Sequence, residues 1–370
     1  MHLCSPLRPV ALAVLAGLAS APLAAQEAAA PAPELPVGYT APGQEDAGRV
    51  IVLNKAAHTA MVIDVATGET LATLKTGVGP HEVAVHPEGR FAVVANYGEQ
   101  EMGSSLSVID LATLELVGGI DLGAPIRPHG LAFEPDGKHL WVSAEVVRQA
   151  WRVSFPGGEV VAKVDSEANA THMVAWAPNG RVFTANIGSG STSVIGPDGE
   201  GGFKLLAKVP TGAEAEGVCV TPDGRHVWVS NRREGTVSVL DAESLKLVTE
   251  LPCEGFPIRA MASPDGRLVL VTSAIAGKLS LFDAVEPAFL GAIEMPFQVG
   301  EEGDAILGQM GESPIPIGVS LHASGKLAFV ANAAVDRVAV VDLIRRKVVA
   351  QLPTGRGPDG IAWVPSPRAR

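Results

Sequence analysis

Three features of the sequence predict an all-β fold, a seven-bladed β-propeller with four antiparallel strands per blade. One phrase recurs along the chain, and its copies are separated by steps of 48, 43, 44, 43 and 58 residues. Each unit holds short apolar runs with β-branched residues at alternate positions, which favours strands over helices. The two ends of the repeat region each match part of a unit. A period of roughly 40 to 50 residues with four strands per unit is typical of a propeller.

The clearest copy of the unit occupies residues 215–255. Its four apolar runs are residues 218–220, 227–230, 237–240 and 245–251. The tripeptide Pro222-Asp223-Gly224 forms a tight turn after the first run, and further turn residues separate the others. Four strands joined by such short loops form an antiparallel meander, in which neighbours in sequence pair with each other.

The two ends of the chain supply the seventh blade. Residues 50–76 match the last three strands of a unit, and residues 358–364 match a first strand. A blade built from both ends closes the ring, so that no sheet edge stays open. We therefore expect the propeller to span residues 49–365, followed by a tail at 366–370.

The first residues have the features of a secretory signal peptide over 1–25. Arg8 precedes an apolar run at 10–18, and small residues lead to a cleavage site near Ala24 or Ala25. This run is too short to span a membrane, and no second long apolar segment follows, so no transmembrane segment is expected. Residues 26–48 are typical of a flexible lead-in. We expect a secreted or periplasmic monomer.

The net charge argues against nucleic-acid binding, and the positions of the cysteines argue against a disulfide bond. The formal net charge of −12 disfavours nucleic-acid binding, which needs clustered Lys and Arg, and Arg232 and Arg233 are interpreted as a solvated loop. In the mature chain Cys219 lies in a first strand and Cys253 at the end of a fourth strand. Three strand spacings, roughly 14 Å, separate such strands. We therefore expect two buried free thiols rather than a disulfide bond.

Two sets of residues are expected to have structural roles. One large apolar residue per second strand should pack between blades, and the Asp that ends a third strand should cap the following turn. The apolar set is Ile51, Val93, Trp141, Phe183, Trp228, Leu270 and Phe329, and the Asp set is Asp64, Asp110, Asp241, Asp283 and Asp342. Four histidines beside the first turn of their units are interpreted as surface residues, namely His86, His139, His226 and His322.

The candidate site lies at one mouth of the channel, where each first strand begins and each second strand ends. The first-strand positions are His81, His129, His172, Glu216, Arg259, Ile317 and Asp359. The second-strand positions are Asn54, Asn96, Ala144, Asn186, Asn231, Ser273 and Asn332. Nearly all of the first set are ionisable, which a purely structural repeat does not need. We expect a ligand to contact His81, His129, His172, Glu216, Arg259, Asp359, Asn96, Asn186 and Asn231.

Two interpretations of the three histidines stay open. His81, His129 and His172 fall in consecutive blades, and three imidazoles with one open position suit a divalent transition metal. Alternatively they only line the mouth and hydrogen-bond nearby loops, and no cofactor is needed. Two long segments, 97–105 and 297–314, are expected at the same mouth, either as binding loops or as tolerated insertions. His58 is a minor candidate there.

The phrases VVAN, FTAN, VSNRREGTVSVLD and FVANAAVDRVAVVD resemble the YVTN family of β-propeller repeats. The resemblance covers nearly all of residues 49–365, and it implies a seven-bladed propeller outside the cytoplasm. Related propellers include lactonases, a lyase and the propeller of nitrous oxide reductase, where histidines at the channel mouth hold copper. This chain departs from that last pattern because it has no full ring of histidines.

Three functions follow from these observations. The first is an exported propeller that binds a small molecule or an envelope protein at the channel mouth without catalysis. The alternative is a metal-assisted, lactonase-like hydrolase or a lyase. In that mechanism His81, His129 and His172 hold the metal, which polarises a carbonyl or activates water, and Glu216 is the general base. The third function is a structural envelope protein that needs no site.

Overall fold

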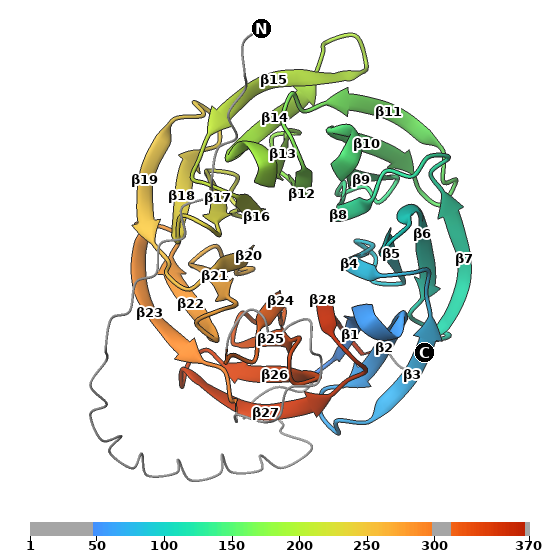
Figure 1. Cartoon of the computed structure of the whole chain (residues 1–370), viewed down its shortest axis with the longest axis vertical. Coiled ribbons are helices and arrows are strands. Elements are labelled where there is room, and N and C mark those ends of the chain that lie inside the picture. The colour runs from blue at the N-terminus through green and yellow to red at the C-terminus, as the bar shows by residue number, and fades with distance from the viewer. Residues whose placement is uncertain (1–46, 298–311, 367–370) are drawn as a thin grey trace, which may run out of the picture. The chain divides into compact units, whose positions relative to one another are not determined.

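The computed structural model describes residues 47–297 and 312–366. In these residues 28 strands form seven four-stranded sheets, arranged as blades around a central opening (Figure 1). The predicted seven-bladed propeller is therefore confirmed. The predicted signal peptide, the lead-in up to residue 46, residues 298–311 of the long insertion and residues 367–370 lie outside the described residues.

Every blade runs from an inner strand beside the channel to an outer strand at the rim. Blade 1 combines β28 with β1, β2 and β3, and blades 2 to 7 follow in chain order from β4 to β27. The inner strands are β28 (Pro358–Val364), β4 (Pro80–Val85), β8 (Pro128–Phe133), β12 (Thr171–Trp176), β16 (Ala215–Val220), β20 (Pro257–Ala262) and β24 (Pro316–Leu321). The second strands are β1 (Arg49–Asn54), β5 (Phe91–Gly98), β9 (His139–Ala144), β13 (Val182–Asn186), β17 (His226–Asn231), β21 (Leu268–Ser273) and β25 (Leu327–Asn332).

The two remaining layers complete each blade. The third strands are β2 (Thr59–Asp64), β6 (Met102–Asp110), β10 (Gln149–Ser154), β14 (Ser191–Pro197), β18 (Thr236–Asp241), β22 (Lys278–Asp283) and β26 (Arg337–Asp342). The outer strands are β3 (Thr70–Lys75), β7 (Glu115–Asp121), β11 (Val160–Asp165), β15 (Phe203–Pro210), β19 (Leu247–Pro252), β23 (Ala288–Glu294) and β27 (Lys347–Pro353). Short 3-10 turns follow three second strands, namely η1 (Lys55–Ala57), η2 (Glu145–Val147) and η3 (Ile187–Ser189).

Blade 1 closes the ring as predicted. Strand β28 pairs antiparallel with β1, with Arg49 opposite Val364 and Ile51 opposite Ala362. The last strand of the chain therefore completes the sheet that the first three strands begin. This pairing occupies the inner edge of β1, which would otherwise present unpaired backbone groups.

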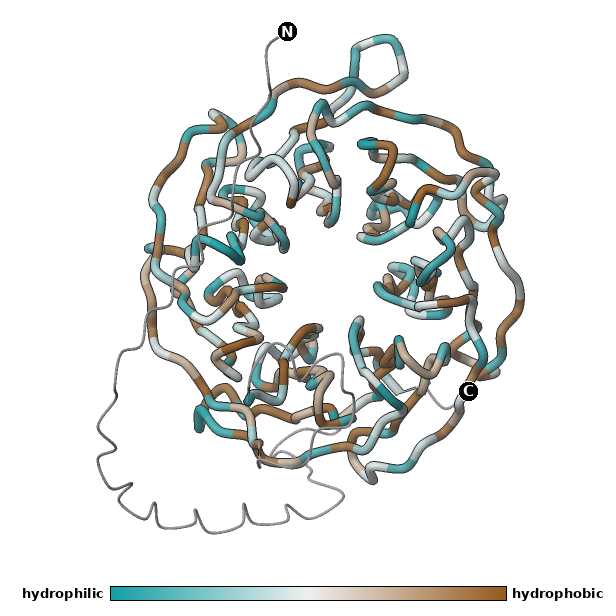
Figure 2. Tube along the Cα trace, viewed as in Figure 1, coloured by the Kyte–Doolittle hydropathy of each residue, from teal (hydrophilic) through white to brown (hydrophobic). Residues whose placement is uncertain are grey.

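The position of a strand in its blade decides its burial pattern. All six residues of β17 (HVWVSN) are buried, because neighbouring blades cover both faces of a second strand. The outer strand β15 (FKLLAKVP) instead alternates between partly buried and exposed residues, since one face meets solvent. Figure 2 shows this alternation as hydrophobic and hydrophilic colours that follow each other along the outer strands.

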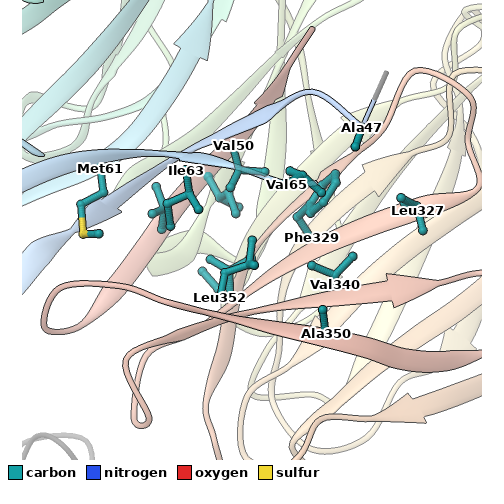
Figure 3. Packing of buried hydrophobic residues seen from close by; sticks show 14 of the residues in the cluster. Ala47, Val50, Met61, Ile63, Val65, Leu327, Phe329, Val340, Ala350 and Leu352 are labelled. Carbon is teal, nitrogen blue, oxygen red and sulfur yellow. The ribbon is translucent and has the colours of Figure 1, made fainter. Parts of the chain in front are cut away.

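The hydrophobic core lies between the blades. All seven large residues predicted for it are fully buried. Between blades 7 and 1, for example, Phe329, Val340 and Leu352 pack against Val50 and Ile63 (Figure 3). Each interface of this kind is a separate cluster, so the stability of the ring is distributed around it.

Two smaller predictions are also confirmed. Each of the five predicted Asp residues accepts hydrogen bonds from backbone N–H groups of the turn that follows it. Cys219 and Cys253 are free thiols as predicted, but only Cys253 is buried, whereas Cys219 is partly exposed. Desolvation still raises the pKa of Cys219 to about 12. Among the residues that the structure describes, no helix is long and apolar enough to cross a membrane.

The prediction that the four histidines at the opposite rim are surface residues was wrong for two of them. His226 and His322 are buried, whereas His86 and His139 are partly exposed. His226 Nδ1 lies 3.2 Å from Ala284 O in the next blade, and the His322 ring packs 4.5 Å from that of Trp363. The turn between an inner and a second strand therefore contacts the following blade, which a blade considered alone does not reveal.

Candidate functional site

A β-bulge places the candidate site residues in every blade. In blade 2, Pro80 pairs with Asn96 and Val83 with Val94, so two inner residues, His81 and Glu82, face one residue of β5. The register between inner and second strand shifts at this point in all seven blades. A bulge bends its strand and re-aims its side chains, and here it brings residues of different blades into contact.

Strand pairing corrects the predicted alignment of blade 6. Pro257 pairs with Ser273 and Ala260 with Val271, so Ile258 takes the first bulge position and Arg259 the second. Counting back from the turn proline gives the same result, because His81 and Ile258 each precede that proline by six residues. Arg259 therefore corresponds to Glu82 and not to His81.

Glycine occupies the second bulge position in four blades because the next blade approaches closely there. These glycines are Gly130, Gly217, Gly318 and Gly360. A Cβ atom on Gly318 would lie 2.0 Å from the Asp359 carbonyl oxygen, and one on Gly360 would lie 2.4 Å from that of His81. The other three blades carry Glu82, Met173 and Arg259 at this position.

Two of these residues form an ion pair across the channel. Arg259 Nε donates to Glu82 Oε1 at 2.7 Å, although 177 residues separate the two in sequence. Their strands β20 and β4 belong to blades 6 and 2, which lie on opposite sides of the opening. The pair lines one end of a channel cavity of about 330 Å³ that extends along the inner strands to Trp176.

His172 is held between two carboxylates. Its Nδ1 lies 2.7 Å from Glu145 Oε2, and its Nε2 lies 3.2 Å from Glu216 Oε1. Burial alone would lower the pKa of His172, but the charge of Glu216 and the hydrogen bonds that the ring donates to both carboxylates raise it. Both ring nitrogens therefore act as donors, and neither has a lone pair available for a metal.

Glu216 is surrounded by positive charge. Arg232 Nη1 lies 2.6 Å from Oε2, and Arg259 Nη1 and His172 Nε2 each lie 3.2 Å from Oε1. Burial would raise the pKa of Glu216, but these cations lower it far below its ordinary value. Such a carboxylate is a weak proton acceptor, which disfavours its predicted role as general base. Arg232, predicted as part of a solvated loop, is instead part of this network.

Lys55 and Asp359 fix the tautomer of His81. Lys55 Nζ lies 3.1 Å from Nε2, and an ammonium group can only donate, so Nε2 must accept. The proton on Nδ1 then faces Asp359 Oδ2 at 2.7 Å, in a direction bent away from a linear hydrogen bond. Burial lowers the pKa of His81 to about 4, so the ring is neutral at pH 7.

His129 differs from its neighbours because neither of its ring nitrogens has a hydrogen-bond partner in the described part of the chain. The side chain is 0% exposed. Its ring centroid lies 4.1 Å from that of His81 and 3.5 Å from that of His172. Burial lowers the pKa of His129 well below its ordinary value, and the charge of His172 lowers it further. The ring is therefore neutral, buried and without a polar partner.

The predicted asparagines hold their own blades together. Asn96, Asn186 and Asn231 each donate from Nδ2 to Ser or Thr hydroxyls of the third strand in the same blade, at 2.9 to 3.4 Å. The residue directly after this predicted position at the end of the second strand reaches the channel mouth instead. In four blades this residue is Lys55, Tyr97, Glu145 or Arg232. Asn96 and Tyr97 are successive residues of β5 and point to opposite faces, whereas Lys55, Glu145 and Arg232 lie in the turn that follows the second strand.

Tyr97 packs against the histidines and extends the network. Its hydroxyl donates to Glu145 Oε1 at 2.8 Å, and its ring centroid lies 5.1 Å from His81 and 5.4 Å from His129. The segment 97–105 was predicted as a long loop, but most of it is strand, because β5 ends at Gly98 and β6 begins at Met102. His58 lies beside this hairpin, with Nε2 3.7 Å from a carboxylate oxygen of Glu99.

In the described residues, one group at the mouth has the spacing of metal ligands. His81, Glu82 and His129 each offer a ligand atom within 4.8 Å of the others. This set shares two residues with the predicted His81, His129 and His172, and it contains Glu82 where His172 was expected. A second such group, Glu134, Asp136 and His139, lies at the opposite rim, where Arg152 binds both oxygens of Glu134 at 2.6 and 2.8 Å.

Comparison with known proteins agrees with the fold. Residues 182–298, less than half of the chain, match the family model described as YNCE-like beta-propeller. This match and the seven blades are consistent with the predicted resemblance to YVTN-type repeats. A search of curated proteins gives no match.

Solved structures give the same result at low sequence identity. A protein of Desulfotomaculum acetoxidans, described as functionally unknown, has a TM-score of 0.72 at 15% identity, with 86% of this chain and 99% of that chain covered. Hydrazine synthase of Kuenenia stuttgartiensis has a TM-score of 0.63 at 16% identity, covering 77% and 89%. The dihydro-heme d1 dehydrogenase NirN has a TM-score of 0.59 at 16% identity, covering 83% and 63%. These likenesses concern the fold alone.

Proposed function

We propose that this propeller is an exported binding protein whose ligand site is the ring of charged side chains at the channel mouth. The ring contains the predicted His81, His129, His172, Glu216, Arg259 and Asp359. The residues added by the structure are Glu82, Lys55, Tyr97, Glu145 and Arg232. The exported location rests on the signal-peptide features of residues 1–25.

The unpartnered ring of His129 carries this proposal. Buried polar groups in proteins nearly always have a hydrogen-bond partner, and one left without costs about 1–3 kcal/mol. Single atoms of other buried side chains in the described residues also lack a partner, among them His81 Nδ1 and Asp359 Oδ1, but His129 is the histidine whose two ring nitrogens both do. A ligand that binds an imidazole nitrogen removes this cost. In the unliganded protein the His129 nitrogens lack this interaction, and it forms only when the ligand binds.

The ion pairs favour binding over the hydrolase or lyase alternative. Glu216 is engaged by three cations, and Glu82 is engaged by Arg259. A general base needs a pKa near the working pH and a free lone pair directed at the substrate. The carboxylates of this ring instead stabilise a fixed arrangement of charges around the histidines, which suits the recognition of a ligand.

The test compares two buried histidines by thermal unfolding. His129→Phe replaces an unpartnered polar ring with an apolar one, so we expect a Tm equal to or above that of the wild type. His226→Phe is the matched control, since it removes the hydrogen bond to the Ala284 carbonyl. We expect this control to lower the Tm by about 2–4 °C.

The same two variants then show whether a ligand binds at the channel mouth. Divalent cations, inorganic anions and small carboxylic acids are added in turn to each protein, and the Tm is measured again. A ligand of the mouth should raise the Tm of the wild type and of His226→Phe but not that of His129→Phe. If His129→Phe instead destabilises as much as the control, then His129 is a structural residue and the proposal fails.

A further inference from the structure

We infer that the ligand of this site is a single divalent transition-metal ion, bound by His81, Glu82 and His129. The inference deepens the proposed function, because it names the ligand class of the same site. Two neutral imidazoles and one carboxylate form a donor set suited to zinc or iron(II). Arg259 contacts Glu82 through Oε1, so Oε2 is the oxygen that would bind the ion. Three protein ligands leave further coordination positions open to water or to a bound small molecule.

The three side chains are close enough to share an ion after a small adjustment. Their ligand atoms lie within 4.8 Å of one another. Ligand atoms that bind one ion at about 2.1 Å can be at most about 4.2 Å apart. The side chains must therefore draw together by less than about 1 Å. All three come from adjacent blades 2 and 3, within or beside the inner-strand bulges, so no blade has to move to make the site.

Asp359 prepares His81 to bind a metal. Metal-bound histidines usually direct their second ring nitrogen at a carboxylate or carbonyl, which sets the tautomer and orients the ring. His81 has this arrangement already, with Nδ1 2.7 Å from Asp359 Oδ2. The lone pair of His81 is therefore on Nε2. Asp359 is a positioning residue here, since it acts on the metal through His81.

Lys55 occupies the place that the ion would take. Its Nζ lies 3.1 Å from His81 Nε2, so it uses the same lone pair that a metal would need. Nζ also lies 3.7 Å from Asp359 Oδ2, and the Lys55 side chain is 37% exposed. The side chain can therefore turn out into solvent. In the absence of metal, the ammonium group of Lys55 balances the charge of Asp359. When a divalent ion binds, its two positive charges replace that of Lys55, which moves out of the site.

His129 supplies the second independent observation. Within residues 47–297 and 312–366 its buried nitrogens have no partner, and a metal would take the lone pair of one of them. His172 takes no part as a ligand, because Glu145 and Glu216 hold both of its nitrogens. Two adjacent histidines, whose rings are tilted by 36° to each other, thus differ in the described residues: His172 has polar partners and His129 lacks them.

The experiment titrates the metal-free mature protein with Co²⁺ and records its visible absorption and binding heat. We expect one ion per chain, and displacement of Co²⁺ by Zn²⁺. Glu82→Gln and His129→Phe each remove a ligand and should weaken binding by at least about 100-fold. Asp359→Asn should weaken it by about 10–100-fold. Lys55→Met should strengthen it by about tenfold or more, because it removes a competing positive charge.

Two controls test whether the site is at this mouth. His139→Phe alters the second His-and-carboxylate group, and Lys347→Met removes a lysine in the outer strand β27. Both should leave the affinity for Co²⁺ unchanged. Near-UV circular dichroism verifies that each variant is folded. The gain expected for Lys55→Met keeps the test informative even if a ligand variant fails to fold.

Four outcomes would overturn the inference. It fails if His139→Phe, and not His129→Phe, abolishes Co²⁺ binding. It also fails if Lys55→Met binds Co²⁺ more weakly than the wild type. If none of Mn²⁺, Fe²⁺, Co²⁺, Ni²⁺, Cu²⁺ and Zn²⁺ binds, but another ligand stabilises the protein only when His129 is present, the metal inference fails and the proposed function stands. If no ligand of either kind depends on His129, both fail.

Discussion

The carboxylate of Asp241 shows how one side chain holds a turn of the propeller. Its Oδ1 accepts hydrogen bonds from the hydroxyl of Ser244 at 2.6 Å and from its backbone N–H at 2.7 Å. These bonds lower the pKa of Asp241, because they stabilise the charged form. Since the folded pKa lies below the ordinary value of 3.8, the bonds contribute stability above pH 3.8. That contribution is lost as the pH falls through the folded pKa.

We expect Asp241→Ala to lower the free energy of unfolding by about 0.5–1.5 kcal/mol at pH 7, because it removes these acceptors. Asp241→Asn keeps an acceptor oxygen and should cost less at pH 7. It should also lose less stability than the wild type between pH 5 and pH 3, since an amide does not titrate there. Urea unfolding at the three pH values measures this. Equal acid sensitivity of the wild type and Asp241→Asn would contradict the assignment.

The candidate site shows how far a sequence can identify single residues. Five residues could be predicted because each lies at the start of an inner strand, at a position that recurs in every repeat. They are His81, His129, His172, Glu216 and Asp359. The direction of a side chain was harder to predict. Asn96 and Tyr97 are neighbours, but only Tyr97 contacts the histidines, because an error of one residue selects the opposite face of a strand. Arg259 was misaligned by the same single step.

At the level of the strand, the bulge at the start of each inner strand is what creates the site. It adds a residue that has no partner in the second strand, and that residue can turn toward the channel. The sequence indicates this bulge, because a glycine follows the first bulge residue in four blades. The glycine is needed where the next blade comes so close that a Cβ atom would overlap its backbone. Glu82 departs from this pattern, and the structure shows that it lies across the channel from Arg259 instead.

Two glycine-to-alanine variants test this close approach. In Gly318→Ala the new Cβ would lie 2.0 Å from the Asp359 carbonyl oxygen, so we expect the free energy of unfolding to fall by about 1–3 kcal/mol. Gly118→Ala is the control, because Gly118 lies in outer strand β7 with nothing within 4 Å of the added atom. Its effect should be near zero or stabilising by up to about 1 kcal/mol. Chemical unfolding of both variants measures the difference, and equal values would mean that the blades are free to separate at the mouth.

At the level of the whole molecule, ring closure brings together residues that the repeat pattern treats as unrelated. Repeat counting predicts seven blades, and the partial units at the two ends predict where the ring closes. It does not predict that Glu82 and Arg259 meet, because they are 177 residues apart and no periodic rule pairs them. Asp359 reaches His81 only because β28 joins blade 1, beside blade 2. The site is therefore a product of closure as well as of the single blades.

The last prediction concerns the closing strand. A chain that ends at Gly357 lacks β28, so it exposes the inner edge of β1 and removes Ile361 and Val364 from two hydrophobic clusters. We expect it to lose cooperative thermal unfolding and to elute from a sizing column as aggregates, because an open, apolar strand edge pairs with other chains. A chain that ends at Ser366 keeps all of β28 and is the control.

Adding the missing strand back separates this cause from a general effect of truncation. A synthetic peptide of residues 356–366 should bind the chain that ends at Gly357 and restore its monomeric elution, because it restores both the pairing with β1 and the burial of Ile361 and Val364. The same peptide with Asp in place of Ile361 should fail, since that position is buried between blades 7 and 1. If the truncated chain is already monomeric and unfolds at the temperature of the control, then β28 does not hold the ring closed.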